Sequence, residues 1–176
     1  VRLRQQIFRY LQDGSMPPQR WYVPIFLRAG SKAGIVRQTL LLTENEQTVE
    51  FEESPDWVVV NAGGHGFYRV RYSEELLDRL KGTLKEQLSS VEKFGLVNDT
   101  CAVTLAGLVS PIEYLSVIDL MRDERDVNIW ATIIGSCHNL ERILDDDQCD
   151  RLAERVRALV APAVEDLGWS RKEGEN

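Results

Sequence analysis

The first part of the chain alternates between apolar and polar positions over short runs, and glycines and prolines separate these runs. A period of two is typical of half-buried strands, and closely spaced strands without helical patterns between them indicate an antiparallel sandwich. Pro24 should place its strand at an edge or a bulge, because proline cannot donate a ladder hydrogen bond. The predicted strands are Val1–Phe8, Trp21–Leu27, Ile35–Thr43, Thr48–Glu52, Trp57–Val60 and Phe67–Tyr72, with turns at Pro17-Pro18 and Gly30–Gly34.

The segment from Trp57 to Tyr72 is the most informative part of the pattern. Two apolar runs flank a cluster of glycines, which adopt positive φ without a steric penalty, and Asn61 also tolerates that conformation. We therefore expect a strand, a Gly-rich turn and a second strand. The second run alternates, so one face should carry Tyr68, Val70 and Tyr72, and the other Phe67, Arg69 and Arg71.

After Tyr72 the apolar period lengthens to between three and four, which predicts helices. Ser73 caps the first, and Ser89 with Glu92 forms a capping box for the second. Ser110-Pro111 begins the third, Asp126 the fourth, and the cluster from Asp145 to Asp147 the fifth. The buried positions expected in chain order are Leu76, Leu77, Leu80, Leu84, Leu88; Phe94, Val97, Cys101, Leu105; Tyr114, Leu115, Ile118, Met121; Ile129, Trp130, Ile133, Cys137, Leu140; and Leu152, Val156, Leu159, Val160.

The change of period predicts an α+β chain in two domains. Residues 1–72 should form an antiparallel β-sandwich, and residues 73–176 the start of an antiparallel α-helical array of the HEAT or armadillo kind. Such stacks need several units and a polar cap, so the array is expected to be truncated. An apolar face at Leu159, Val160 and Val164 should then remain exposed and lead to self-association or crystal contacts, and the SRKEGEN tail should be disordered.

The two halves also differ in charge. Residues 1–72 hold nine Lys/Arg against seven Asp/Glu, whereas residues 73–176 hold twelve against twenty-one, giving net charges of +2 and −9. An acidic chain opposes a phosphate backbone, so we expect no nucleic-acid partner. No run reaches the roughly 18 apolar residues of a membrane span, so we expect no membrane partner. Three cysteines fit a reducing compartment, and a cytoplasmic location is expected.

The residues with candidate chemistry each have a structural interpretation that we favour. Cys137 and His138 are adjacent, with Cys149 further on, but neighbouring helical residues point about 100° apart and cannot both bind one ion. His65 is expected in an exposed turn, and the Gly63–Gly66 loop lacks the strand-to-helix context of a nucleotide site. The acidic cluster from Asp145 lacks the glycine and distal Glu of a calcium loop. We therefore predict no catalytic, cofactor-binding or metal-binding residue in this chain.

Arg69 is the residue for which a role between the domains is expected. Its planar guanidinium suits a carboxylate of the helical domain. Asp99 is the preferred partner, because it is the acidic residue inside the second helix beyond its first turn. Glu75 and Glu92 are the competitors.

Several motifs together resemble the aminopeptidase N family of zinc aminopeptidases, of the gluzincin type. The segment NAGGHGFYRVRY is similar to the family's junction between its β-sandwich and its C-terminal helical domain. The segment KFGLVNDTCAVTLAG resembles the second helix of that domain, although Cys101 stands where the family usually carries a bulky aromatic residue. Upstream, the stretch from Trp21 to Gly30, the LLLT run and Trp57 match further landmarks in the same order.

The resemblance implies that this chain is a non-catalytic C-terminal fragment of a metallopeptidase. The family's H-E-x-x-H and G-x-M-E-N motifs are absent from the sequence, so the fragment should be inactive and hold no cofactor, while the parent protein would use zinc. The parent would be a hydrolase that removes N-terminal residues from peptides. This part would link to its catalytic domain and cover the active-site chamber, with peptide substrates of the parent as further partners. The alternative is an independent protein-interaction module of β-sandwich plus helical repeats.

Overall fold

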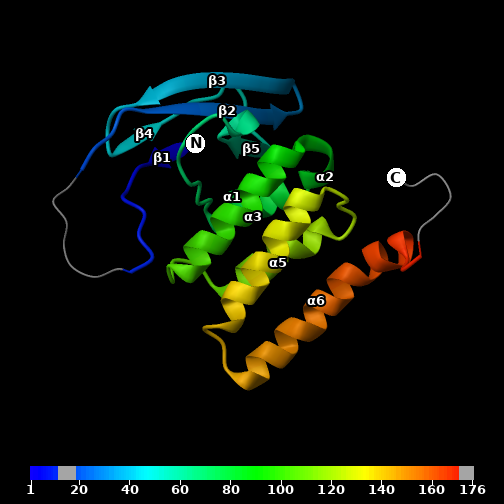
Figure 1. The fold of residues 1–176 in the computed structure, drawn as a ribbon. Coiled ribbons are helices and arrows are strands. Elements are labelled where there is room, and N and C mark those ends of the chain that lie inside the picture. Colours follow the sequence, from blue (N-terminus) through cyan, green and yellow to red (C-terminus); the bar gives the residue numbers. More distant parts are fainter. Residues whose placement is uncertain (12–18, 171–176) are drawn as a thin grey trace.

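The computed structural model describes residues 1–11 and 19–170, apart from the side chains of residues 84 and 85. It is an α+β structure with the strands at one end and the helices below them, and the last helix extends along one side (Figure 1). The strands are β1 (Arg2–Arg4), β2 (Val23–Ser31), β3 (Gly34–Leu42), β4 (Glu46–Thr48) and β5 (Trp57–Val60). The helices are α1 (Glu74–Lys81), α2 (Leu84–Gln87), α3 (Ser90–Leu105), α4 (Pro111–Ile118), α5 (Val127–Glu141) and α6 (Asp146–Leu167), with 3₁₀ turns η1 (Ala62–Gly64) and η2 (Asp119–Met121).

The strands form two small antiparallel sheets, one of β1 with β4 and one in the order β3-β2-β5. The β2–β3 hairpin pairs residues 23 to 31 with 42 to 34, and Gly34 follows its turn with a φ of 127°, which favours glycine. Side chains from both sheets meet in a sheet core that contains Leu3, Ile25, Leu27, Ala29, Leu42, Val49 and Val58.

Strand β5 contributes to two different cores. Trp57 and Val59 point into the helical core, while Val58, between them, is fully buried in the sheet core. Successive strand residues face opposite sides, so a strand covered on both sides needs a continuous apolar run. The WVVV sequence of β5 meets that need and makes the strand a wall that both cores share.

The helical part follows its capping signals closely. Ser73, Ser110 and Asp126 accept backbone hydrogen bonds at the starts of α1, α4 and α5. Capping boxes begin α3, with Ser89 and Glu92, and α6, with Asp145 and Gln148. Helix α3 packs against α4 and α5, and α5 packs against α6. No helix among the described residues is long and apolar enough to cross a membrane.

Two predicted strands are wrong. Phe67–Tyr72 is not a strand, so the predicted hairpin with β5 does not form. Instead, the Val60 N–H donates to the Tyr72 hydroxyl at 2.9 Å, and the Val70 N–H donates to an Asp99 carboxylate oxygen at 2.9 Å. Side chains thus take the hydrogen bonds that a β-ladder would have made. The predicted strand Thr48–Glu52 is also shifted, because the chain pairs with β1 earlier, over Glu46–Thr48.

Other boundaries need smaller corrections. The first strand ends at Arg4 and does not reach Phe8. Strand β2 is central in its sheet, but Pro24 lies outside the stretch of residues 27 to 30 that pairs with β5. Pro24 has a paired strand on only one side, so its missing N–H removes no hydrogen bond between β2 and β5. Phe94, expected to be buried, is 38% exposed.

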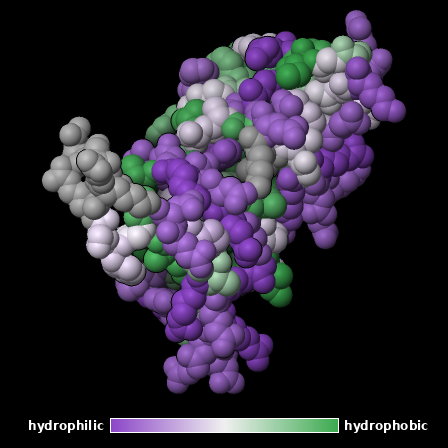
Figure 2. All heavy atoms as spheres, turned by 90° about the vertical axis from the view of Figure 1, so that its right-hand side faces the viewer, coloured by the Kyte–Doolittle hydropathy of each residue, from purple (hydrophilic) through white to green (hydrophobic). Residues whose placement is uncertain are grey.

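The last helix is more buried than we expected for the end of a truncated array. Leu159 is buried at 1% exposure, whereas Val164 remains exposed, so the predicted apolar face is wrong at Leu159. The side of the molecule that carries α6 is predominantly hydrophilic, with hydrophobic residues in small separate groups (Figure 2). The predictions for Pro17-Pro18, for the side chain of Leu84 and for the tail beyond Ser170 lie outside the described residues.

Candidate functional site at the junction of sheet and helices

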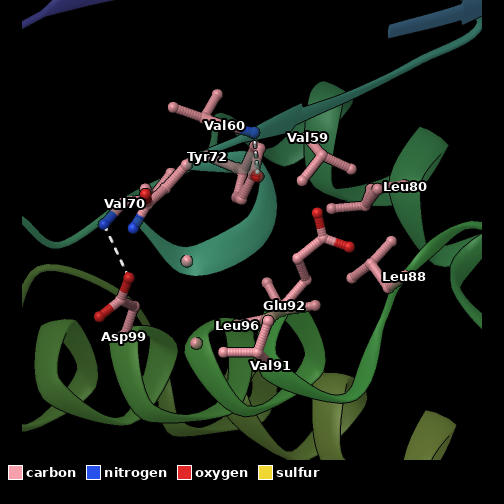
Figure 3. A pocket seen from close by; sticks show the side chains of 13 residues that line it. Val59, Val60, Val70, Tyr72, Leu80, Leu88, Val91, Glu92, Leu96 and Asp99 are labelled. Carbon is pink, nitrogen blue, oxygen red and sulfur yellow. Dashed lines mark hydrogen bonds between the residues drawn. The ribbon is translucent and has the colours of Figure 1, made fainter. Parts of the chain in front are cut away.

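Helix α3 carries two carboxylates toward the strands. Glu92 and Asp99 lie about two helical turns apart and therefore on the same face. Figure 3 shows Glu92 directed from α3 toward the space between Val59 and Leu88, and Asp99 directed toward the backbone at Val70. Each carboxylate joins the helix to the strand region at a separate point.

Glu92 is the more deeply buried of the two, with a side chain only 3% exposed. It receives hydrogen bonds from the Ser89 N–H, the Ser89 hydroxyl and the Gly63 N–H, each at 2.9 Å, and an ion pair from Arg28 at 2.8 Å. Burial alone would raise the pKa of the Glu92 carboxyl. The hydrogen bonds and Arg28 outweigh that effect and hold the pKa below its ordinary value, so Glu92 is ionised at neutral pH.

Arg28 reaches Glu92 from the middle of β2. Its guanidinium also donates to the Gln87 carbonyl oxygen and lies 5.9 Å from the ring centroid of Trp57. The Trp57 ring lies directly over Gly30, where an added Cβ would be 2.3 Å from the ring. Glycine at this position thus lets Trp57 and Arg28 pack side by side between the sheet and α3.

The Gly-rich loop supplies the backbone donor that Glu92 uses. Asn61 adopts the left-handed conformation and bridges the loop, donating to the Gly66 carbonyl oxygen at 3.0 Å and accepting from the Gly66 N–H at 2.7 Å. Gly63, with a φ of 78°, directs its N–H toward Glu92. The loop is therefore a structural element that presents an N–H to a buried carboxylate.

Asp99 forms the second connection, and the predicted pair with Arg69 is confirmed. The two side chains approach to 3.1 Å, with Arg69 32% and Asp99 14% exposed. The competitors have other partners, since Glu75 pairs with Arg79 and Glu92 with Arg28. Burial raises the pKa of the Asp99 carboxyl, and the Val70 N–H and Arg69 offset this only in part.

A small cavity of about 40 Å³ lies between the two carboxylates, lined by β5, the loop after it and α3 (Figure 3). A single water needs roughly 10–15 Å³ measured in this way, so the cavity has no room for a peptide or a nucleotide. The geometry fits a rigid connection between the strands and the helices. It does not fit a binding or catalytic pocket.

The other candidate residues do not come together. Cys137 is buried in the helical core, where burial raises the pKa of its thiol to about 11, while the His138 side chain is exposed and contacts Glu141 at 3.2 Å. Cys149 faces the Glu141 carbonyl oxygen. Asp145 caps α6, and exposed His65 stacks edge-on against Phe26.

These residues do not fit a zinc ion. Within residues 1–11 and 19–170, no group of three or more His, Cys, Asp or Glu side chains is placed to hold a metal. The donor set also lacks the three convergent ligands that a catalytic zinc needs.

Sequence reasoning missed the connection between Arg28 and Glu92. A signal was present, because Arg28 is a charged residue within the apolar run of a central strand, between Leu27 and Ala29. A charge at such a position is rarely buried without a partner. Only the fold shows that the partner is the capping-box glutamate of α3.

Comparisons with known proteins find related sequences over nearly the whole chain. A family model described as the ERAP1-like C-terminal domain matches residues 57–176, beginning at the first residue of β5. The chain is 30% identical over 176 residues to a puromycin-sensitive aminopeptidase of Caenorhabditis elegans, covering 96% of this chain and 19% of that protein. It is 27% identical to aminopeptidase M1-A of Oryza sativa subsp. japonica, covering 99% of this chain and 21% of that protein.

A third relative is the mitochondrial aminopeptidase 2 of Saccharomyces cerevisiae, at 26% identity over 96% of this chain and 18% of that protein. The chain thus spans about a fifth of the length of the curated relatives it matches.

Proposed function

This chain belongs to the ERAP1-like C-terminal domain family, the C-terminal part of aminopeptidase N-like proteins, and we propose that it is a non-catalytic part of a longer zinc aminopeptidase. The parent protein would remove N-terminal residues from peptides with a zinc ion held elsewhere in the polypeptide. This part would connect to the catalytic domain and cover the active-site chamber. Such a cover excludes bulk water and folded proteins from the metal.

The division into two domains is part of this proposal. Residues 1–72 would form the β-sandwich that adjoins the catalytic domain, and residues 73–176 the beginning of a HEAT-like or armadillo-like helical array. The packing of α3 against α4 and α5, and of α5 against α6, supports the array. A cytoplasmic location and association through an incompletely covered helical face stay predictions.

The observation that carries the proposal is the pair of connections from α3. A cover must keep a fixed angle to the body on which it is mounted if it is to limit which peptides enter. Glu92 holds β2 and the Gly-rich loop, and Asp99 holds Arg69 and the Val70 backbone. Two anchors at separate points along one helix restrain rotation as well as separation.

The test uses the parent polypeptide expressed from its complete reading frame. We expect Glu92→Gln to alter kcat/KM for a decapeptide by about fivefold, the lower end of typical coupling between sites, while a single-residue aminoacyl reporter is cleaved as before. Glu75→Gln is the matched control, because Glu75 is exposed on α1. Equal effects on both substrates would contradict the covering role. A reading frame without a zinc site would favour the alternative, an independent interaction module.

A further inference from the structure

A groove of about 690 Å³ opens beside the strands. It is lined by the segment after β1, the start of β2, the extended segment before α1, and the end of α3 with the residues that follow it. Its lining includes Phe8, Trp21, Tyr22, Phe67, Val103 and Leu108. The groove can hold several residues of an extended chain, which makes it much larger than the cavity beside Glu92.

Side-chain hydrogen bonds hold the walls of the groove in place. The Gln5 amide donates to the Trp21 carbonyl oxygen at 3.0 Å and to the Glu44 carbonyl oxygen at 2.9 Å, and it accepts from the Trp21 N–H at 2.8 Å. Opposite, the Arg69 guanidinium lies 5.2 Å from the Phe8 ring centroid and is held by Asp99. The groove is therefore preorganised, and binding there would lose little entropy on ordering.

The charge of the lining has one sign. It contains Arg2, Arg4, Arg69 and Arg71 and no acidic residue. Glu46 is shared between Arg2 and Arg4, and Asp99 compensates Arg69. Among the residues that the structure describes, no carboxylate pairs with Arg71, whose side chain lies at the surface. The groove thus retains the charge of about two arginines.

The aromatic side chains around these arginines are exposed to solvent. Phe67 is fully exposed, at 108%, and Trp21 and Tyr22 are also exposed. Clustered aromatic and arginine side chains are typical of the central part of a protein–protein interface. Two uncompensated charges suit one or two carboxylates, whereas a nucleic-acid strand would bring one phosphate for every nucleotide.

We infer that this groove binds an extended, acidic polypeptide segment with apolar side chains, and that the segment belongs to the catalytic part of the same parent polypeptide. This inference rests on the proposed function and adds the surface through which the chain contacts the catalytic part. In the curated relatives about four fifths of the protein lies outside the matched region, so such a parent contains ample chain to fill the groove. An aliphatic or aromatic side chain would cover Phe67 and Tyr22, and its neighbouring carboxylate would pair with Arg71.

The chemistry is tested on the 176-residue chain with a blocked octapeptide of alternating glutamate and leucine, followed by calorimetry. We expect binding that weakens with salt, and a loss of about tenfold in Arg71→Glu and in Phe67→Ala. Arg37→Glu is the matched control, because Arg37 is exposed on β3 outside the groove. Equal binding of a lysine–leucine octapeptide, or equal effects of Arg71→Glu and Arg37→Glu, would overturn the inference. Tighter binding of a single-stranded oligonucleotide through the same residues would do so too.

The source of the segment is tested on the intact parent. If its own catalytic part fills the groove, the octapeptide should bind the parent at least about tenfold more weakly than it binds the 176-residue chain. A parent that binds the octapeptide as tightly as the chain would overturn this inference and leave the proposed function standing. A parent without aminopeptidase activity would overturn the proposed function instead.

Discussion

The helical core and the sheet core meet at β5, and different kinds of contact stabilise them. The sheet core lies between two small sheets and contains seven buried residues, all apolar. The helical core is larger, and polar connections from α3 close the side that faces the strands. Apolar packing is tolerant of small shifts, whereas a buried carboxylate with several donors fixes one arrangement. The comparison shows that buried polar contacts fix the position of α3 against the strands.

The largest change in stability is expected at β5, where adjacent residues are buried in different cores. Trp57→Ala should lower the free energy of unfolding by about 3–5 kcal/mol, because it empties the space between Gly30, Arg28 and the helices. Val58→Ala removes less volume from the sheet core and should cost about 2 kcal/mol. Denaturant unfolding followed by far-UV circular dichroism measures both.

Trp169 provides the control for loss of an indole ring. It is almost fully exposed, so Trp169→Ala should change the stability by no more than about 0.5 kcal/mol. A Val58→Ala variant that is less stable than Trp57→Ala would mean that the sheet core, and not the helical one, dominates the stability of the chain.

The second test removes the charge that joins the two regions. Glu92→Gln should cost about 3 kcal/mol, because Arg28 keeps a buried charge without its counter-ion. Replacing both partners, with Arg28→Met added, should recover part of this loss, since the uncompensated charge is then gone. Thermal unfolding of the single and double variants measures these changes in stability. If the double variant is less stable than Glu92→Gln, the Arg28 packing against Trp57 matters more than the ion pair.

The same contrast between regions explains what the sequence could predict. Helix starts at Ser89, Ser110 and Asp126 are set by residues a few positions apart, so local patterns locate them. The Arg69–Asp99 pair was also predictable, because the α+β order limits which carboxylates can approach the end of the strand region. The helix caps join residues that are close in sequence, and the Arg69 pair has few possible partners.

The strand region could be predicted only in part. The alternating run Phe67–Tyr72 has the pattern of a strand, yet Tyr72 and Asp99 take the backbone hydrogen bonds that would have defined one. Strand pairing is decided by partners far away in the chain, and period-two alternation does not identify them. The α3 connection at Arg28 was missed for the same reason, because 64 positions separate Arg28 from Glu92.

The two carboxylates of α3 allow the finest test, since their pKa values shift in opposite directions. The folded state holds the Glu92 pKa below 4.5, so its contribution to stability is present above that pH and is lost as the pH falls through the folded value. The folded state raises the Asp99 pKa above 3.8, so this group binds its proton more tightly when folded and lowers stability as the pH rises through that window.

The cost of Glu92→Gln should therefore grow between about pH 3 and about pH 6, while the cost of Asp99→Asn should shrink over the same range. Urea unfolding at several pH values measures both differences, with the exposed pair variant Glu75→Gln as the reference for general charge effects. If both costs change with the same sign, the two anchors do not differ in the balance between burial and hydrogen bonding. In that case the hydrogen bonds and the ion pair of Glu92 would offset the cost of its burial no better than those of Asp99 do. The two connections would then stabilise the junction equally, contrary to what their geometry indicates.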